Sequence, residues 1–82
     1  MKQYNLTLTI LGAEYKSKGK TIEECFENIP LLWKEIKAKG IVKLTNGEKS
    51  CEKLFALPIL RRIMVNPVAR MLWARRLESL LN

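Results

Sequence analysis

Residues 41–54 read IVKLTNGEKSCEKL and predict a β-hairpin. Asn46-Gly47 tolerates the positive φ angles of a type I′ turn, whose twist matches that of the two flanking strands. A two-residue loop at this point pairs Val42 with Cys51. Because side chains alternate between the two faces of a strand, Val42, Leu44 and Cys51 then lie on one face of the sheet.

A second hairpin is predicted upstream, at residues 4–18. In its first arm, apolar residues alternate with Asn and Thr, which is typical of a strand with one buried face: Tyr4, Leu6, Leu8 and Ile10. Gly12 permits a tight reversal. In the second arm, Tyr15 faces the core and the lysines that follow suit a solvated sheet edge.

Between the hairpins, residues 22–39 have the apolar spacing of a helix. Thr21 and Glu24 form the capping-box pattern, in which each side chain satisfies a free backbone N–H of the first turn. Gly40 is a good terminator. Pro30 removes one N–H and clashes with the preceding turn, so we expect a kink, or two short helices meeting near residues 28–30.

The chain is predicted to be helical from residue 58 to its end. Leu57–Val65 has Pro58 in its first turn, and a second helix begins at Asn66-Pro67 because Asn is a favoured N-cap and Pro a favoured first helical residue. The element order is ββαββαα. It predicts a single α+β domain over residues 1–82, with two hairpins in one antiparallel or mixed sheet packed by a kinked helix and a C-terminal helical segment.

The hydrophobic core is predicted from the same periodicities. The residues expected to be buried face one another across the sheet and the helix: Leu6, Leu8, Ile10, Ile22, Phe26, Ile29, Trp33, Ile36, Val42, Leu44 and Leu54.

The positive charge is divided unevenly along the chain. The net charge is +7; residues 1–54 hold every lysine and residues 55–82 hold every arginine. A lysine is a hydrated point charge that keeps a surface soluble, whereas the guanidinium of arginine binds carboxylate or phosphate with a planar fork of donors. Residues 58–82, rich in Arg and Leu, are therefore a candidate interface, and the basic pI of about 9.7 favours an acidic partner.

The composition argues against an enzyme. The sequence contains no His and no Asp, which removes the commonest general base and most zinc and magnesium sites. It contains no phosphate-binding glycine motif, so we predict no catalytic residue, metal, cofactor or small-molecule substrate. Cys25 and Cys51 are interpreted as core residues in a reducing compartment, with a disulfide between them as the alternative.

A cytoplasmic location is predicted from two features of the sequence. No apolar N-terminal stretch follows a basic region, as a secretory signal requires. The longest uninterrupted apolar stretch, Leu54–Leu60, is seven residues and contains a proline, which is too short to cross a bilayer.

The last helix has apolar residues on more than one side. Trp73 and Leu77 share one arc of the helical wheel, whereas Val68, Met71 and Leu72 lie outside it. Such a helix is either enclosed by its own protein or buried against a partner, and a chain of 82 residues offers little to enclose it. We assign partner binding to the arginines and two anchors: Arg61, Arg62, Arg70, Met71, Trp73, Arg75 and Arg76.

Two kinds of partner fit this helix. In a protein-assembly interpretation, the aromatic, Met and Arg side chains form an interface, either in a homo-oligomer or in a larger particle such as a virion. In the alternative, the arginines contact nucleic-acid phosphates and Trp73 stacks on a base. The leucines near the C-terminus favour assembly, since phosphate binding does not need them. A membrane surface is disfavoured because the helix lacks one clean polar face.

Overall fold

The computed structural model describes residues 3–82. Its elements follow the predicted order and confirm an α+β fold: β1 (Tyr4–Ile10), β2 (Ala13–Gly19), α1 (Ile22–Asn28), a 3₁₀ helix (Trp33–Glu35), β3 (Gly40–Thr45), β4 (Ser50–Phe55), α2 (Leu57–Val65) and α3 (Pro67–Leu81).

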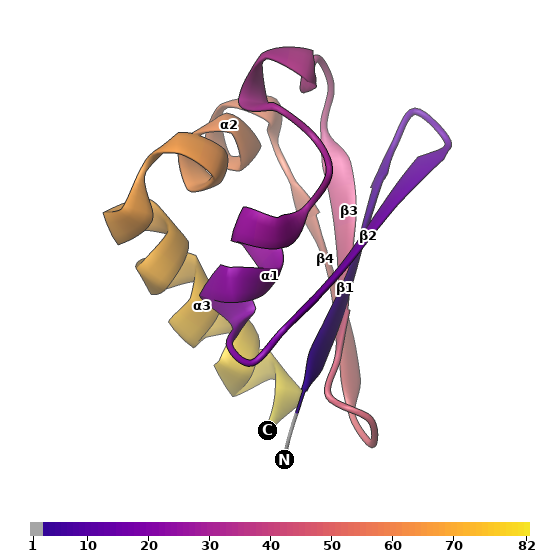
Figure 1. Cartoon of the computed structure of the whole chain (residues 1–82), viewed down its shortest axis with the longest axis vertical. Coiled ribbons are helices and arrows are strands. Elements are labelled where there is room, and N and C mark those ends of the chain that lie inside the picture. Colours follow the sequence, from indigo (N-terminus) through magenta and orange to yellow (C-terminus); the bar gives the residue numbers. More distant parts are fainter. Residues whose placement is uncertain (1–2) are drawn as a thin grey trace.

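The four strands form one antiparallel sheet in the order β2-β1-β3-β4. β1 is therefore a central strand, which joins the two hairpins by pairing with β3. The helices cover one face of the sheet and leave the other face open (Figure 1). α1 packs against β1 and β2, while α3 packs against β4, α1 and α2.

The first hairpin turns as predicted. Ile10 pairs with Ala13, so the loop contains only Leu11 and Gly12. Both have positive φ angles, 51° and 83°, as a type I′ turn requires. Gly12 adopts this conformation freely, whereas Leu11 adopts it against the steric preference of a side chain with a Cβ.

The second hairpin forms, but the register predicted for it is wrong. Cys51 pairs with Leu44, and Val42 pairs with Lys53. Asn46 lengthens the loop to residues 46–49, because its side-chain Oδ1 accepts a hydrogen bond of 3.0 Å from the Lys49 N–H. The shift is two residues, so the predicted sharing of one face by Val42, Leu44 and Cys51 is retained.

The helix predicted over residues 22–39 is much shorter. The Thr21 side chain caps it at the predicted position, accepting from the Glu24 N–H at 3.1 Å. The helix ends at Asn28, and Ile29 has extended backbone geometry, as expected for the residue before Pro30. The chain then continues without helix to the 3₁₀ turn Trp33–Glu35. The proline therefore ended the helix instead of kinking it.

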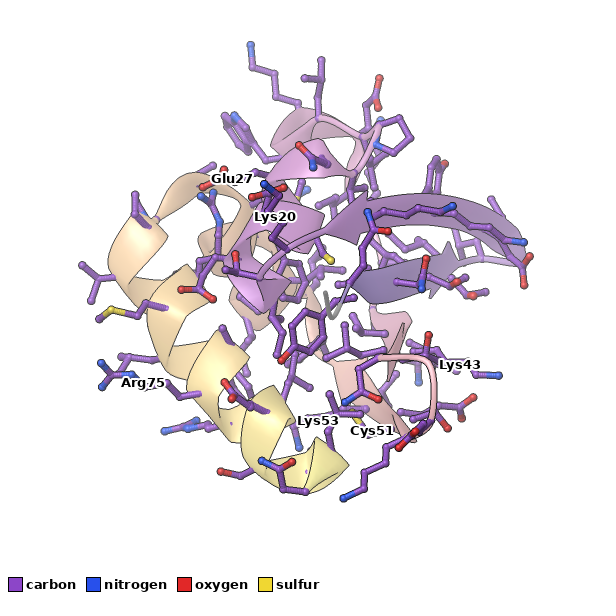
Figure 2. All side chains as sticks on the ribbon, turned by 60° about the horizontal axis from the view of Figure 1, so that its bottom comes forward. Lys20, Glu27, Lys43, Cys51, Lys53 and Arg75 are labelled. Atoms are coloured by element: carbon purple, nitrogen blue, oxygen red, sulfur yellow. The ribbon has the colours of Figure 1, made fainter. Side chains whose placement is uncertain are left out.

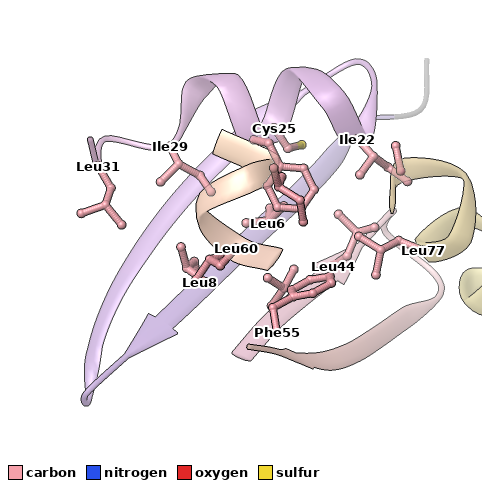
Figure 3. Packing of buried hydrophobic residues seen from close by; sticks show 14 of the residues in the cluster. Leu6, Leu8, Ile22, Cys25, Ile29, Leu31, Leu44, Phe55, Leu60 and Leu77 are labelled. Carbon is pink, nitrogen blue, oxygen red and sulfur yellow. The ribbon is translucent and has the colours of Figure 1, made fainter. Parts of the chain in front are cut away.

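The core lies between the covered face of the sheet and the helices. Figure 3 shows strand residues facing residues of α1, α2 and α3, with Phe55, Leu60 and Leu77 fully buried. Nine of the predicted core residues are buried: Leu6, Leu8, Ile10, Ile22, Phe26, Ile29, Ile36, Val42 and Leu44.

Two predicted core residues, Trp33 and Leu54, are exposed by 46% and 55%. Trp33 was predicted to be buried from its position on a long helix. Because α1 ends at Asn28, that helical spacing does not extend to Trp33. Leu54 pairs with Ile41 on the open face of the sheet, and Phe55 takes the core position instead. A strand places successive residues on opposite faces, so only one of these two neighbours can be buried.

The open face of the sheet carries lysines, together with the exposed pair Ile41 and Leu54. Across its middle, Lys16, Thr7, Lys43 and Glu52 lie side by side on the four strands. Figure 2 shows Lys43 pointing away from the helices. This face contrasts with the helical side, where the arginines lie.

Candidate functional site

The segment predicted to bind a partner folds as two helices that meet at Asn66. The Asn66 N–H donates to the Arg62 carbonyl and closes α2. The Asn66 side chain accepts from the N–H groups of Val68 and Ala69 at 2.9 and 3.3 Å and opens α3. The predicted N-cap is confirmed, and it fixes the direction in which α3 leaves α2.

Arg70 is held inside the protein. Its Nε and Nη2 atoms donate to the carbonyl oxygens of Ile63 and Met64 at 3.1 and 3.0 Å, and its Nη1 atom forms a 3.1 Å ion pair with Glu27. Carbonyls in the last turn of a helix lack intrahelical partners, so the guanidinium caps the end of α2. One side chain on α3 thereby binds both α2 and α1, and only 12% of it is exposed.

Arg61 also makes an internal contact. Its Nε donates a 2.8 Å hydrogen bond to the carbonyl oxygen of Ile36, in the segment that leads from the 3₁₀ helix to β3. This segment lacks regular structure, so its carbonyl needs such a donor. Two of the five arginines assigned to partner binding thus have structural roles within the chain.

The other predicted residues of α3 lie on its solvent side. Arg75 and Arg76 are exposed, and Met71 is 37% exposed. Figure 2 shows Arg75 projecting outward from the helix. Val68 and Leu72 lie on the same outer side and are 60% and 47% exposed. The apolar residues that the helical wheel separated from the core arc are therefore uncovered.

Trp73 lies between the core and the surface. Its ring meets Phe55 edge-on, with the centroids 4.9 Å apart and the planes at 88°. The guanidinium carbon of Arg76 lies 4.7 Å from the indole centroid, and the Lys53 ammonium lies 5.6 Å from it. Cations approach the electron-rich face of an indole favourably, so the two charges are held close to an apolar surface.

A shallow groove of about 280 Å³ runs between α2 and α3 beside this ring. It brings together three of the predicted residues, Arg62, Trp73 and Arg76. Ile59, Ala69 and Leu72 complete its walls. Met71 and Arg75 lie outside the groove lining, and Arg61 and Arg70 hold the helices in place. The candidate site is this groove together with the outer side of α3.

Sequence reasoning missed Ile59 in the groove and Lys53 beside it, at the Trp73 ring. Ile59 is three residues before Arg62 and shares its side of α2, which a helical wheel of that short segment would have shown. Lys53 is two residues before Phe55 and therefore lies on the helix-covered face of β4. The alternation of side chains along β4 was the signal that could have found it, because Lys53 shares the face of Cys51 in the predicted register as well as in the observed one.

A larger hollow of about 510 Å³ lies beside the 3₁₀ helix and includes Leu31, Trp33 and Met64. Its two carboxylates are engaged in structural contacts. Glu27 pairs with Arg70, and Glu35 accepts from the Leu32 N–H at 3.3 Å. Among the described residues that line this hollow, no nucleophile lies beside a base.

The two thiols are free in the structure and sit in apolar surroundings. Cys25 is buried, and this burial, with a smaller contribution from the charge of Glu24, raises the pKa of its thiol to about 11. Burial also raises the pKa of the Cys51 thiol. Thiols held in their neutral form are weak nucleophiles and weak metal ligands. Within residues 3–82, no three His, Cys, Asp or Glu side chains gather in a way that could hold a metal ion.

No protein-family model, curated protein or solved structure matches this chain. None of the helices formed by residues 3–82 is long and apolar enough to cross a membrane.

Proposed function

We propose that this chain is a non-catalytic interaction protein that docks onto a protein partner through α3. The partner is another copy of the chain or a larger particle such as a virion. The observation that carries the proposal is the uncovered outer side of α3, where Val68, Met71 and Leu72 are 60%, 37% and 47% exposed. Apolar residues grouped on a helix surface mark an interaction site.

The composition of the groove supports the same function. Trp and Arg are the residues most enriched among those that dominate binding energy at protein interfaces, and Met is also enriched there. Trp73, Arg76 and Arg62 line the groove, and Met71 lies nearby on α3. An interface of this kind needs no catalytic group, in keeping with a sequence that lacks His and Asp.

The rigidity of α3 also favours docking. Asn66 caps its first turn, and Arg70 joins it to α1 and α2. A surface that is already ordered loses little conformational entropy when a partner binds, so more of the contact energy contributes to affinity. The two free thiols are consistent with a reducing compartment, and we place this function in the cytoplasm.

Nucleic acid is the competing partner, and support for it is weaker. Arg61 and Arg70 already donate to backbone carbonyls, which leaves Arg62, Arg75 and Arg76 as the exposed cations of this segment. Phosphate binding draws its affinity from the number of charges neutralised, and it makes no use of Val68 or Leu72.

Leu72→Glu tests the proposed function. This change puts a charge at the centre of the outer side of α3, and we expect it to abolish self-association in sedimentation velocity or the capture of a partner from an extract of the producing cells. Leu54→Glu is the matched control, because it makes the same change at a leucine that is 55% exposed on the open sheet face.

If Leu72→Glu and Leu54→Glu changed self-association and partner capture equally, docking through α3 would be contradicted. A labelled oligonucleotide, titrated at several salt concentrations, separates the competing function. Phosphate-dominated binding weakens linearly on a log–log plot against salt, with a slope set by the number of phosphates neutralised.

A further inference from the structure

The groove between α2 and α3 combines apolar walls with a positively charged rim. Ile59, Ala69, Leu72 and Trp73 form the walls, and Arg62 and Arg76 are the charged residues of the lining. Its volume of about 280 Å³ is enough for one or two large side chains of a partner. Among the described residues that line it, none carries a carboxylate.

The cations around the groove are available to a partner. Among residues 3–82, Arg62, Arg75 and Arg76 form no salt bridge, and all three are exposed. Lys53 adds a fourth positive charge beside Trp73. These charges lie next to apolar surface, where an ion pair formed with a docked partner is less screened by water than a pair in open solvent.

From this arrangement we infer that the groove receives an acidic protein segment, with an apolar side chain between the helices and flanking carboxylates on Arg62 and Arg76. The inference rests on the proposed docking function and names the chemistry of the partner. Guanidinium groups bind carboxylates with two parallel hydrogen bonds, which fixes the orientation of the segment as well as attracting it.

The same charges argue against a second copy of this chain as the occupant. In a two-fold symmetric dimer, each surface patch faces its own equivalent. The patch that holds Arg62, Arg75 and Arg76 would then face an equally positive patch on the other copy. Like charges placed together across an interface are unfavourable, so a heterologous acidic surface complements this site better.

Nucleic acid is also negatively charged, but the groove suits it poorly. The Trp73 ring already contacts Phe55 and lies under Arg76, so a base would have to displace these contacts to stack on it. Leu72 and Ile59 would face a phosphate backbone that offers them no apolar contact. An acidic protein segment supplies both carboxylates for the arginines and an apolar side chain for the walls of the groove.

Two synthetic helical peptides of about 14 residues provide the test. Both carry leucines at helical spacing, and they differ only in flanking residues, which are glutamates in one and lysines in the other. Trp33→Phe leaves Trp73 as the only tryptophan of the chain, so its emission reports on the groove. Anisotropy of the labelled peptides measures binding independently of that emission.

At about 50 mM NaCl, we expect the glutamate peptide to bind at least about tenfold more tightly than the lysine peptide and to shift the Trp73 emission. The double variant Arg62→Glu/Arg76→Glu should reverse this preference. Lys16→Glu/Lys18→Glu is the matched control, since it changes the net charge equally on the open sheet face and should leave the preference intact. Circular dichroism verifies the fold. If the double variant unfolds, Arg62→Gln/Arg76→Gln replaces it, and this neutral variant should abolish the preference instead of reversing it.

Several results would overturn the inference, and they differ in what they imply for docking. Equal binding of the two peptides, or a dimer that Leu72→Glu dissociates, rejects an acidic partner but retains docking through α3. Displacement of the glutamate peptide by a labelled oligonucleotide that Arg62→Gln/Arg76→Gln no longer binds assigns the groove to nucleic acid. If neither peptide binds and Leu72→Glu changes neither association nor capture, both the inference and the proposed function are wrong.

Discussion

The inner and outer sides of α3 have similar compositions and opposite roles. The inner side carries Arg70 and Leu77, and the outer side carries Arg75 and Leu72. Leu77 is fully buried and Leu72 is 47% exposed. Arg70 donates to three groups of the protein, whereas Arg75 projects outward (Figure 2). The phase of a residue on the helix, and not its type, decides whether it stabilises the fold or is available to a partner.

The two leucines provide the strongest test of this difference. Leu77→Ala should lower the free energy of unfolding by about 2–5 kcal/mol, because it leaves a cavity in the core. Leu72→Ala should change it by less than about 0.5 kcal/mol, since the side chain is largely solvated. Urea unfolding followed by circular dichroism measures both. Comparable losses would mean that the outer side of α3 is part of the core.

Substitution of Arg70 should lower the stability more than substitution of Arg75, and this difference should be smaller than the one between the two leucines. Arg70→Met removes a charged donor from the last carbonyls of α2, and we expect a loss of about 1–3 kcal/mol. Arg75→Met is the matched control, with an expected change below about 0.5 kcal/mol. Thermal unfolding at a single pH compares them. If Arg75→Met were the more damaging variant, the assignment of Arg70 as the structural arginine would be wrong.

The ion pair between Arg70 and Glu27 should contribute less to the free energy of unfolding than the hydrogen bonds from Arg70 to the carbonyls of α2. The Glu27 side chain is 57% exposed, so solvent screens its attraction to the guanidinium. We expect Glu27→Gln to lower stability by less than about 1 kcal/mol, and less than Arg70→Met does. A larger loss for Glu27→Gln would show that the link to α1, and not the cap on α2, holds α3 in place.

The rate of thiol alkylation reports locally on the packing beneath the inner side of α3. The Cys51 sulfur lies 3.9 Å from the carbonyl oxygen of Leu77, under the inner side of α3. Iodoacetamide should therefore modify half-buried Cys51 before buried Cys25, and Leu77→Ala should accelerate this modification whereas Leu72→Ala should not. Mass spectrometry of the modified peptides follows both rates. Faster modification of Cys25 would contradict the burial of α1 against the sheet.

The raised pKa of Cys25 also predicts a pH dependence. Burial favours the neutral thiol in the folded protein, so its pKa is about 11 compared with the ordinary value of 9.0. The unfolded chain therefore loses this proton at a lower pH than the folded one. The resulting stabilisation is fully present below pH 9 and decreases as the pH rises toward 11. Cys25→Ala should remove this part of the alkaline dependence in urea unfolding.

The element order was predictable from the sequence because its signals are local. The Thr21 cap, the Asn66-Pro67 helix start and the period-two alternation of β1 each depend on residues within one turn or strand. The outward position of Val68, Met71 and Leu72 also follows from the helical repeat alone. These parts of the structure required no knowledge of which elements pack together.

The remaining features depend on contacts between distant residues. Arg70 meets Glu27 across 43 positions of sequence, and Arg61 meets Ile36 across 25. Charge and composition alone cannot show that these arginines are enclosed by the fold. The loop of the second hairpin is closed by two hydrogen bonds between Asn46 and Lys49, one of them accepted by the Asn46 side chain, and the Asn-Gly pair alone does not show them. The burial of Phe55 in place of Leu54 was predictable, because Phe55 shares the face of Cys51 in either register.

The central position of β1 has a consequence for the chain during its synthesis. The sheet is complete once residue 55 has emerged, with α1 covering the side of β1 and β2. Leu60, Ile63 and Leu77 are made after the sheet, and until they emerge α2 and α3 cannot cover the inner face of β3 and β4. A nascent chain of this length therefore exposes Leu44 and Phe55, an apolar surface of the kind that chaperones bind. α2 and α3 thus complete the core of the fold and also carry the arginines of the candidate site.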